Sequence, residues 1–447
     1  MPSSFASSSI FTIARTTTSK ALFNTGRSQL HSQQQLSYRT TPPVLFQKTR
    51  LHTSIPMKMT CPKETFQGIK TRKDARSAER KEELKQRWAE RKESRTSTGS
   101  NMPAGTEIRK VLISAYGDES NVSVITDVIP EPAKNEVQVQ VLYSGFSGSD
   151  INMRKGQYPM QNAAPLTPGY NVVGHVVANG QGSSKYQIGD TVCCLSVYEG
   201  EAELANLPEK YLIPVPEGVA LKAATALILD WATAAGMVWH TAHVKSGQKV
   251  FVHGISGAVG FAIAKLSALS GAEVYGTASP KNHDAVREAL PGATPFDYGN
   301  KDWIKTVKGI GGVDAVFDPI GYESWDESYS ILNPTSSMLV GYGGNMSNFT
   351  GEAPRSMIPQ VAKLYARNYL KFWEGRATRF YYITRDDKSF LPDIERLFEL
   401  SRSGKIEVPI KQIFKMNTTE QIREAHRTWG KGKGIGSLLI QVAEDVE

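Results

Sequence analysis

Alternating apolar and polar residues in region 106–213 predict a series of short strands. Residues 122–126 and 136–143 alternate with period two, and the turn-forming segment PEPAKNE separates them. Residues 172–177 are almost continuously apolar, and so is the run TVCCLSV at 191–197, with a turn-rich segment between the two. Short strands divided by Gly- and Pro-containing turns are typical of a small barrel-like β domain, which we predict here.

From residue 221 onward, helix-like and strand-like patterns follow one another. Helical apolar spacing extends over residues 221–239, and a β-branched run follows at 249–253. This alternation is typical of a parallel sheet covered by helices on both faces, so we predict a doubly wound sheet of about six strands. The expected strands are residues 249–253, 273–277, 294–297, 313–318, 336–341 and 369–373, and the expected helices include 258–270, 282–290 and 356–365.

Residues 388–447 no longer follow the strand–helix–strand alternation. They offer a helix at 391–403, a strand signal at VPI, a helix after Thr418 and a final strand GSLLIQV. Because the alternation has ended, we predict that these elements complete the first β domain. The expected fold class is therefore α/β, with a β-rich domain split in sequence around a doubly wound parallel sheet domain.

The turn between the first two strands of the second domain is rich in glycine. Glycine lets the backbone approach a pyrophosphate, and a helix start offers unpaired N–H groups and a partial positive charge. The spacing is GxxGxxG rather than the usual GxGxxG, so a purely structural strand-to-helix turn is the alternative. The predicted dinucleotide contacts are Gly254, Ser256, Gly257, Val259 and Gly260.

The end of the second strand bears on which nicotinamide cofactor is bound. Sites for NAD usually place an acidic residue about 20 positions after the glycines. Residues 277–281 read TASPK and contain no acid. Ser279 and Lys281 can hold a 2′-phosphate, so we predict NADPH as the cofactor. The alternative for Lys281 is a surface lysine at a helix start.

Basic charge is concentrated at the N-terminus. The net charge is +8, but residues 1–101 contain 19 Lys and Arg against 7 Asp and Glu, whereas the remainder contains 33 against 37. The mildly acidic body argues against nucleic-acid binding. Residues 1–60 are rich in Arg and Ser and free of acidic residues, which predicts a mitochondrial transit peptide and a matrix location. A disordered basic tail is the alternative.

Residues 61–105 form a charged linker in this prediction. Within it, residues 70–95 favour a solvated helix, and a partner-binding helix that uses Trp88 is the alternative. Cys193 and Cys194 lie in an apolar run and are expected in the core, which suits a reducing compartment. No run of 18 uninterrupted apolar residues occurs, so we predict no integral membrane segment.

With these residues in place, the chain resembles the medium-chain dehydrogenase/reductase superfamily, and within it the zinc-independent quinone oxidoreductases, including zeta-crystallin and the vesicle amine transport protein-like group. The resemblance implies a GroES-like catalytic domain at 106–227 and 381–447, around a Rossmann NADPH-binding domain at 228–380. The matching segments are SGSDINMRKGQYP (147–159), TPGYNVVGHVVANG (167–180), VHGISGAVG (252–260), GTASPKNH (276–283), FDYGN (296–300), VFDPIGYESWDESYSILNP (316–334), VGYGGN (340–345) and GKGIGSLLI (432–440).

Zinc enzymes of this superfamily carry a Cys and a His-Glu pair at positions where this chain has other residues. Ser147, Tyr170 and Asn171 stand at the matching places. A catalytic zinc needs about three Cys, His or carboxylate ligands, so we predict no metal. His175 lies in the apolar run VVGHVV and is expected to be a hydrogen-bonded core residue. Without a Lewis acid, reduction of a conjugated acceptor is easier than oxidation of an unactivated alcohol.

The resemblance also implies which residues contact the cofactor and the acceptor. Expected cofactor contacts are Thr233, Gly341, Tyr342 and Asn345 beside the nicotinamide, Tyr298 near the adenine phosphate, and Lys431 or Lys433 on the closing C-terminal turn. Ser147, Asp150 and Asn152 match substrate-loop positions, and a structural role is the alternative for Asp150. Quinone reductases more often have Asn and Tyr at the places of Ser147 and Asn152. Tyr158 matches the proton donor of mitochondrial enoyl thioester reductases, and the alternative is a pocket-lining tyrosine with water as the proton source.

Three functions remain open from the sequence. The first is a mitochondrial NADPH-dependent reductase of quinones or α,β-unsaturated carbonyls, and the second is a mitochondrial 2-enoyl thioester reductase. The third is a non-catalytic NADPH-binding interaction protein that uses residues 70–95. The resemblance also implies a homodimer formed through the edge of the Rossmann sheet, expected near residues 336–341.

Overall fold

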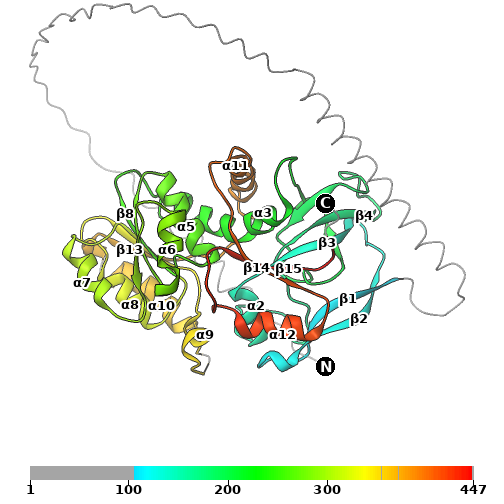
Figure 1. The fold of residues 1–447 in the computed structure, drawn as a ribbon, viewed down its shortest axis with the longest axis horizontal. Helices are drawn as coiled ribbons and strands as arrows, with labels where there is room; N and C mark the ends of the chain where they lie inside the picture. The colour runs from blue at the N-terminus through cyan, green and yellow to red at the C-terminus, as the bar shows by residue number, and fades with distance from the viewer. Residues whose placement is uncertain (1–104, 354, 371, 445–447) are drawn as a thin grey trace, which may run out of the picture. The chain divides into compact units, whose positions relative to one another are not determined.

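The computed structural model describes residues 105–353, 355–370 and 372–444 (Figure 1). The predicted transit peptide and almost all of the predicted charged linker, including residues 70–95, lie outside the described residues.

The N-terminal part of the described chain forms the predicted β domain. Its main sheet has seven strands in the order β14-β15-β3-β4-β5-β7, with β6 paired to β3, and a separate hairpin joins β1 to β2. The strands are β1 (Gly105–Ile113), β2 (Val122–Pro130), β3 (Glu136–Phe146), β4 (Val172–Asn179), β5 (Thr191–Cys194), β6 (Leu204–Pro208), β7 (Ile213–Pro214), β14 (Ile410–Lys415) and β15 (Ser437–Gln441).

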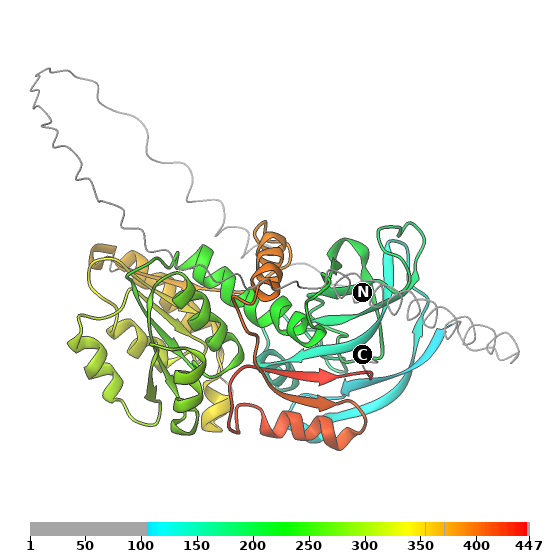
Figure 2. The same cartoon turned by 45° about the horizontal axis from the view of Figure 1, so that its top comes forward.

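The C-terminal residues return to this domain, as predicted. Strand β15 runs antiparallel to β3, with Leu438 opposite Phe146, and β14 pairs with β15. In Figure 2 the red C-terminal strands lie beside the cyan-green strands of the first domain. Helix α12 (Thr419–Thr428) begins where predicted, because the Thr418 side chain accepts a hydrogen bond from a backbone N–H of its first turn.

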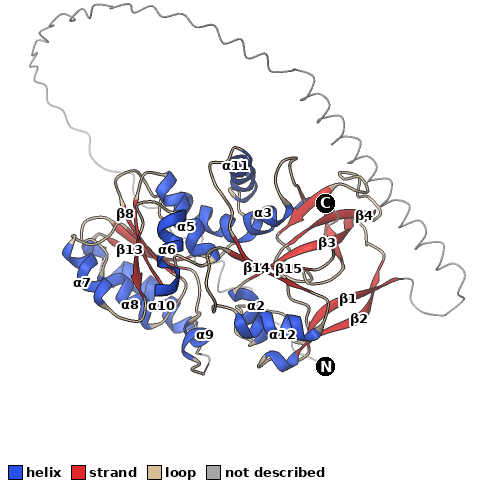
Figure 3. Ribbon diagram, in the orientation of Figure 1, coloured by secondary structure: helices blue, strands red, loops and turns tan. Residues whose placement is uncertain are grey.

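The second domain contains a parallel sheet of six strands in the order β10-β9-β8-β11-β12-β13, which confirms the predicted architecture (Figure 3). Its strands are β8 (Lys249–His253), β9 (Glu273–Ala278), β10 (Thr294–Asp297), β11 (Ala315–Asp318), β12 (Ser337–Gly341) and β13 (Arg376–Phe380). Its helices are α5 (Ala258–Leu269), α6 (His283–Ala289), α7 (Asp302–Gly309), α8 (Glu323–Ser330), α9 (Met346–Thr350) and α10 (Ile358–Leu370), and α11 (Phe390–Arg402) follows the sheet.

The predicted strand at residues 369–373 is wrong. Helix α10 continues to Leu370, Tyr369 is 78% exposed, and the sixth strand is the more polar segment β13. The aromatic run YLKFW suggested a buried strand by composition, but the place beside β12 is taken by β13. Strand propensity depends on how well side chains pack against a sheet. Here the segment that packs beside β12 begins a few residues later in the chain.

The predicted position of the sheet edge is corrected as well. Strand β12 is internal, so the outer strand is β13 rather than residues 336–341. The outer edge of β13 is covered at Thr378, whose backbone N–H donates to the Asn368 side chain at 2.8 Å and whose carbonyl accepts from it at 2.9 Å. The Asn368 side chain therefore occupies the backbone N–H and carbonyl groups with which an added strand would have to pair.

One long helical segment connects the two sheets. It comprises α3 (Leu221–Ala226), the π-helical turn η4 (Leu227–Trp231), α4 (Ala232–Ala235) and the π-helical turn η5 (Gly236–Thr241). Among the described residues it is the segment long and apolar enough to cross a membrane, yet 78% of its most apolar window is buried inside the protein. Trp231 and Phe261 meet edge to face within the core, so the segment is explained as a core helix.

Candidate functional site

The glycine turn between β8 and α5 is shaped by close backbone packing. Gly254 has φ of +69°, which favours glycine. A Cβ on Gly260 would lie 2.2 Å from the Gly254 carbonyl oxygen, so only glycine fits there. Gly257 precedes α5 without a capping side chain. The first N–H groups of the helix, from Ala258 onward, are therefore left for a ligand, as the dinucleotide prediction requires.

The C-terminal turn closes over this glycine turn. The Gly436 N–H donates to the Ser256 carbonyl at 3.1 Å, and the Gly434 N–H donates to the Asn282 side chain at 3.0 Å. Asn282 in turn donates to the Ser256 hydroxyl at 3.2 Å. The structure therefore brings together the predicted residue Ser256 and the predicted closing turn. Asn282, which joins them, was missed because an asparagine at a helix start reads as a cap.

Four lysines belong to the region where a 2′-phosphate is predicted. Lys281 follows β9, Lys431 and Lys433 lie exposed on the closing turn, and the Lys411 ammonium donates to the Lys431 carbonyl at 2.8 Å. Burial lowers the pKa of Lys411, and the positive charge of Lys281 lowers it further. Lys411 therefore links Lys281, whose charge it feels, to the turn that carries Lys431. Lys411 was missed because its place in a strand carries no motif.

Two other predicted residues flank the lysines. Ser279 is half-buried at the end of β9. Tyr298 is 62% exposed, and its backbone N–H donates to the Ala278 carbonyl at 3.4 Å. Both residues therefore lie next to the carboxyl end of β9, where an adenosine ribose is bound in doubly wound folds.

The predicted nicotinamide loop follows β12. Gly341 cannot carry a side chain, because its Cβ would lie 2.6 Å from the Trp325 ring. Tyr342 is half-buried, and the Asn345 amide donates to the Pro319 carbonyl at 3.1 Å. Thr233 is buried on α4, where its hydroxyl donates to the Leu229 carbonyl at 2.7 Å. Its hydroxyl oxygen keeps acceptor capacity for another donor.

An asparagine cluster ties the acceptor loop to the nicotinamide loop. The Asn152 amide donates to the Asn345 side chain at 3.2 Å, and Asn348 donates to Asn152 at 2.9 Å. The Lys155 ammonium donates to Asn348 at 2.6 Å. The structure thus joins the predicted catalytic residue Asn152 to the predicted cofactor residue Asn345. Asn348 was missed, because nothing in a short polar segment distinguishes it.

Ser147 has a structural role at the start of α2 (Gly148–Arg154). Its side chain caps the helix, and its backbone N–H donates to the Asp150 carboxylate at 2.8 Å, which completes a capping box. Helix α2 was not predicted, because seven residues are too few for a periodic pattern. Asp150 is fully buried, and this burial raises its pKa to about 6.

The other two former zinc-ligand positions also make hydrogen bonds within the protein. The Asn171 side chain accepts from the Gly145 N–H at 2.9 Å and donates to the Thr225 carbonyl at 2.7 Å. Tyr170 bonds to other tyrosines. In the part of the chain that the structure describes, no three His, Cys, Asp or Glu side chains gather as metal ligands.

His175 is buried, with the Thr191 hydroxyl 3.2 Å from its Nδ1.

Tyr158 belongs to a cluster of three tyrosine hydroxyls. Its hydroxyl oxygen lies 2.6 Å from that of Tyr170 and donates to that of Tyr382 at 2.8 Å. Tyr170 donates to Tyr382 at 3.4 Å. Burial raises the pKa of both Tyr158 and Tyr170, so both phenols stay protonated at neutral pH. Tyr170 and Tyr382 were missed as members, because 212 positions separate them in sequence.

Behind the nicotinamide loop, a buried polar network fixes the loop that follows β11. The Asp318 carboxylate accepts from the Ser324 hydroxyl at 2.7 Å, the Ser328 hydroxyl at 2.6 Å and the Ile320 N–H at 2.7 Å. The Ser328 hydroxyl also lies 3.0 Å from His253 Nε2. A fully satisfied network of this kind rigidifies its surroundings.

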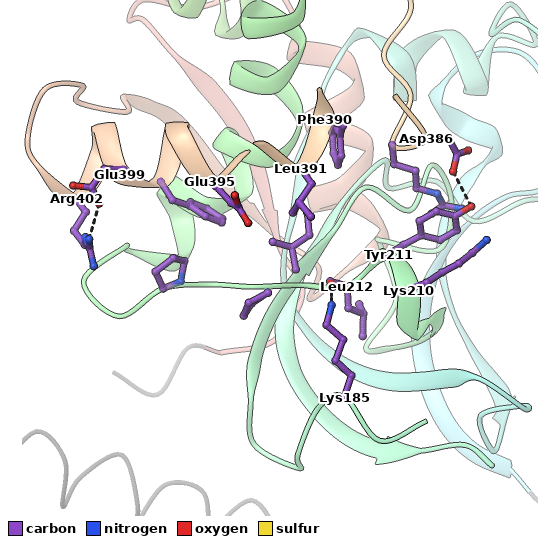
Figure 4. Close-up of a pocket in the computed structure, with 15 residues that line it drawn as sticks. Lys185, Lys210, Tyr211, Leu212, Asp386, Phe390, Leu391, Glu395, Glu399 and Arg402 are labelled. Atoms are coloured by element: carbon purple, nitrogen blue, oxygen red, sulfur yellow. Dashed lines mark hydrogen bonds and ion pairs between the residues drawn. The ribbon is translucent and has the colours of Figure 1, made fainter. Parts of the chain in front are cut away.

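A cavity of about 730 Å³ opens between β7 and α11, away from these residues (Figure 4). None of the predicted site residues lines it. Its lining includes the apolar Phe390 and both cations and anions, among them Lys185, Lys210, Glu395 and Glu399. Because the charges are mixed, the cavity selects no ligand class, and the chemistry of the site is assigned to the carboxyl ends of the parallel strands.

Comparison with known proteins agrees with this arrangement. Residues 133–226 match the alcohol dehydrogenase GroES-like domain, and residues 292–440 match the zinc-binding dehydrogenase domain. The human synaptic vesicle membrane protein VAT-1 homolog-like is 27% identical, over 75% of this chain and 81% of that protein. A probable quinone oxidoreductase of Schizosaccharomyces pombe is 29% identical, over 75% of this chain and 98% of that protein.

Solved structures share the fold. The Escherichia coli quinone oxidoreductase complexed with NADPH has a TM-score of 0.63 at 20% identity, covering 74% of this chain and 99% of that one. The CurK enoyl reductase has a TM-score of 0.63 at 20% identity, covering 75% and 99%. At these identities the likeness concerns the fold.

Proposed function

We propose that this chain, which belongs to the medium-chain dehydrogenase/reductase superfamily, is an NADPH-dependent, zinc-independent reductase of quinones or α,β-unsaturated carbonyls. The single observation that carries the proposal is that a dinucleotide turn is paired with an acceptor side where other residues stand at the positions matching zinc ligands. Ser147, Tyr170 and Asn171 replace them, and each takes part in hydrogen bonds of its own.

The cofactor part of the proposal rests on the fit of the residues to NADPH. The glycine turn leaves its backbone free of side chains where a pyrophosphate would approach, and the uncapped start of α5 supplies N–H donors. Ser279, Lys281 and Lys411 surround the end of β9 with a hydroxyl and two cations. A phosphate gains charge-assisted hydrogen bonds from such groups, whereas an unphosphorylated ribose gains little.

When bound, NADPH supplies the hydride that reduces the acceptor. The chain supplies the remaining functions. Thr233 and the loop with Gly341, Tyr342 and Asn345 would position the nicotinamide ring, and the asparagine cluster holds the acceptor loop against that loop. Tyr158 stays protonated because of its burial, so it can serve as a hydrogen-bond donor or a proton donor to the acceptor.

A second candidate function is favoured by one specific observation. The Tyr158 hydroxyl lies in a partly buried hydrogen-bonded cluster, as a proton donor to carbon requires. This supports a 2-enoyl thioester reductase, and the CurK enoyl reductase shares the fold. Quinones need no such donor, because water can protonate their oxygens.

The experiment that tests the proposal is a titration followed by an acceptor panel. NADPH and NADH are titrated into the protein by fluorescence, and turnover is then measured with quinones, enals and crotonyl thioesters. We expect NADPH to bind at least 10-fold tighter than NADH, and Lys411→Glu to remove most of this preference. A control variant, Lys308→Glu, changes an exposed lysine at the end of α7 and is expected to leave the preference unchanged.

The outcomes separate the alternatives. Turnover of quinones or enals supports the first function, and turnover of crotonyl thioesters alone supports the second. Tight NADPH binding without turnover on any acceptor would favour the non-catalytic interaction protein. A preference for NADH would contradict the assignment of Ser279, Lys281 and Lys411.

A mitochondrial location is a further part of the proposal, supported by the Arg- and Ser-rich, acid-free composition of residues 1–60. Residues 1–60 fused to a fluorescent protein are expected to direct it to mitochondria. A diffuse distribution of the fusion would contradict this part alone.

A further inference from the structure

We propose that Tyr382 is a relay residue that passes solvent protons to Tyr158, and that Tyr170 holds Tyr158 in place during the transfer. The inference rests on the proposed reductase function and narrows its acceptor. A proton relay to carbon is needed for α,β-unsaturated carbonyls rather than for quinones.

The three hydroxyl groups have the geometry of a relay. Tyr158 lies between its two partners, 2.6 Å from Tyr170 and 2.8 Å from Tyr382. Exposure differs across the cluster, since Tyr170 is 2% exposed and Tyr382 is 41% exposed. Tyr382 is therefore the most exposed member, and Tyr158 is half-buried. Tyr170 closes the buried end, and its ring meets that of Tyr158 edge to face at 5.7 Å.

The cluster is assembled from three separate segments at the edge of the crevice. Tyr158 follows α2, Tyr170 follows Gly169 before β4, and Tyr382 follows β13. The Tyr381 N–H donates to the Gly341 carbonyl at 2.8 Å, which places the Tyr382 segment beside the nicotinamide loop. Ligands of open α/β sheets bind outside the carboxyl ends of the strands, and this is where the cluster lies.

Hydroxyl chemistry explains why three tyrosines serve better than one. Each hydroxyl has one proton and two acceptor lone pairs. The Tyr158 hydroxyl donates to Tyr382 in this structure, so its proton must rotate toward the acceptor before transfer. Loss of that proton leaves a phenolate in a partly buried place, which burial disfavours. Rotation of the Tyr170 and Tyr382 hydroxyls then lets both donate to the phenolate until a proton returns through Tyr382.

The proposed step balances in atoms and charge. Hydride adds to the β-carbon of the acceptor, and the electron pair of the carbon–carbon double bond moves toward the carbonyl to give an enolate. The Tyr158 O–H bond breaks as an α-carbon–hydrogen bond forms. The Tyr382 proton then moves to the Tyr158 oxygen, and a solvent proton replaces it on Tyr382. The net reaction consumes one NADPH, one proton and one enone.

The same cluster predicts a difference between acceptor classes. The oxygens of a reduced quinone exchange protons with water directly, so the relay adds little to quinone reduction. Protonation at carbon is slower and benefits from a positioned acid, which typically contributes about 10² to 10⁴ in rate. From the relay we therefore infer that the acceptors of this site are enones, including enoyl thioesters.

The test compares enone and quinone turnover in Tyr382→Phe. We expect kcat with an enone to fall about 10-fold with KM unchanged, kcat with 9,10-phenanthrenequinone to stay within about twofold, and the solvent deuterium isotope effect on enone turnover to rise. Tyr382→His keeps a group that exchanges protons near neutral pH and is expected to recover part of the enone rate. The matched control is Tyr365→Phe, a tyrosine of equal exposure on α10.

A second readout needs neither cofactor nor turnover. Tyrosine ¹³Cζ spectra of the protein are expected to lose one resonance and shift two others in Tyr382→Phe. Tyr365→Phe is expected to lose one resonance and shift none. This measurement remains informative if the variant proves inactive for an unrelated reason.

Each result bears on the relay. Equal losses of enone and quinone turnover in Tyr382→Phe, or no loss of either, would overturn the relay. So would an unchanged isotope effect or the absence of shifted ¹³Cζ resonances. Wild-type turnover of quinones but not enones would overturn the relay and leave the proposed function standing, whereas no turnover of either acceptor would remove the proposed function itself.

Discussion

The two sides of the crevice are built from different parts of the chain. The cofactor side is formed largely by backbone: glycines pack at distances that exclude a Cβ, and the start of α5 presents its N–H groups. The acceptor side is formed by side chains, namely three tyrosine hydroxyls and three asparagine amides drawn from distant segments. Backbone recognition suits a pyrophosphate, which is the same in every dinucleotide, and side-chain recognition lets an acceptor site be changed residue by residue.

The largest expected effect comes from breaking the cofactor side at Gly260. Gly260→Ala would place a Cβ 2.2 Å from the Gly254 carbonyl oxygen, so the turn must move. We expect a destabilisation of about 3 kcal/mol and a loss of NADPH affinity of about 100-fold or more, because backbone strain and ligand contact coincide there. Urea unfolding and NADPH titration measure the two effects.

Gly309→Ala provides the matched control for this prediction. Gly309 ends α7, and its Cβ would meet no atom within 4 Å. We expect it to leave NADPH affinity unchanged and to stabilise the fold by about 0.5 kcal/mol. Wild-type affinity in Gly260→Ala would mean that the pyrophosphate binds elsewhere.

The next effect lies in the helical segment that connects the two sheets, at Asp230. This carboxyl is buried, its Oδ2 accepts from the Ser437 hydroxyl at 2.6 Å, and its Oδ1 has no hydrogen-bond partner among the described residues. Burial raises its pKa from 3.8 to about 7. The folded state therefore binds more protons than the unfolded state between about pH 4 and pH 7, so stability falls as pH rises through this window.

Asp230→Asn removes this titration while keeping an acceptor for Ser437. The raised pKa corresponds to a penalty on the order of 4 kcal/mol above pH 7, part of which the variant recovers. We expect a gain of about 2 kcal/mol at pH 8 and none at pH 4. Unfolding curves across pH 4–8 check the slope, and a gain of equal size at both ends would rule out ionisation as the cause.

The cofactor side was largely predictable from sequence, and the acceptor side was not. Strands β8 and β9, helix α5 and the glycine turn follow from patterns within one 33-residue stretch, since local periodicity and glycine spacing encode them. Ser256 and Lys281 were predicted as cofactor contacts from the same stretch. Lys411 was missed, because only the return of the C-terminal strands brings it near Lys281.

The tyrosine cluster shows why the acceptor side resists prediction. Tyr158 was recognised through a motif, whereas Tyr382 follows a strand that was itself placed too early in the chain. The apolar run at residues 369–373 attracted that assignment, and β13 lies at Arg376–Phe380. Tyr170 was noted only as a missing zinc ligand. Its hydrogen bond to Tyr158 depends on two loops meeting, which no local pattern encodes.

The smallest expected effect is at Asn348, where the acceptor side contacts the cofactor side. Asn348→Ala removes the hydrogen bonds from Asn348 to Asn152 and Asn345 and the one it accepts from Lys155. These bonds are only partly buried, so we expect a destabilisation of about 1 kcal/mol. The acceptor loop would also be held less firmly on the nicotinamide loop, so kcat should fall about threefold while NADPH affinity stays unchanged.

Thr350→Ala in the same short helix is the control for Asn348→Ala. Its hydroxyl donates to the Met346 carbonyl and accepts from the Glu352 N–H, and neither bond reaches the acceptor loop, so neither kcat nor affinity should change. If Asn348→Ala weakened NADPH binding as much as turnover, the asparagine cluster would belong to the cofactor side. Side chains would then contribute to the cofactor side as well, and the contrast between a cofactor side formed by backbone and an acceptor side formed by side chains would not hold at this loop.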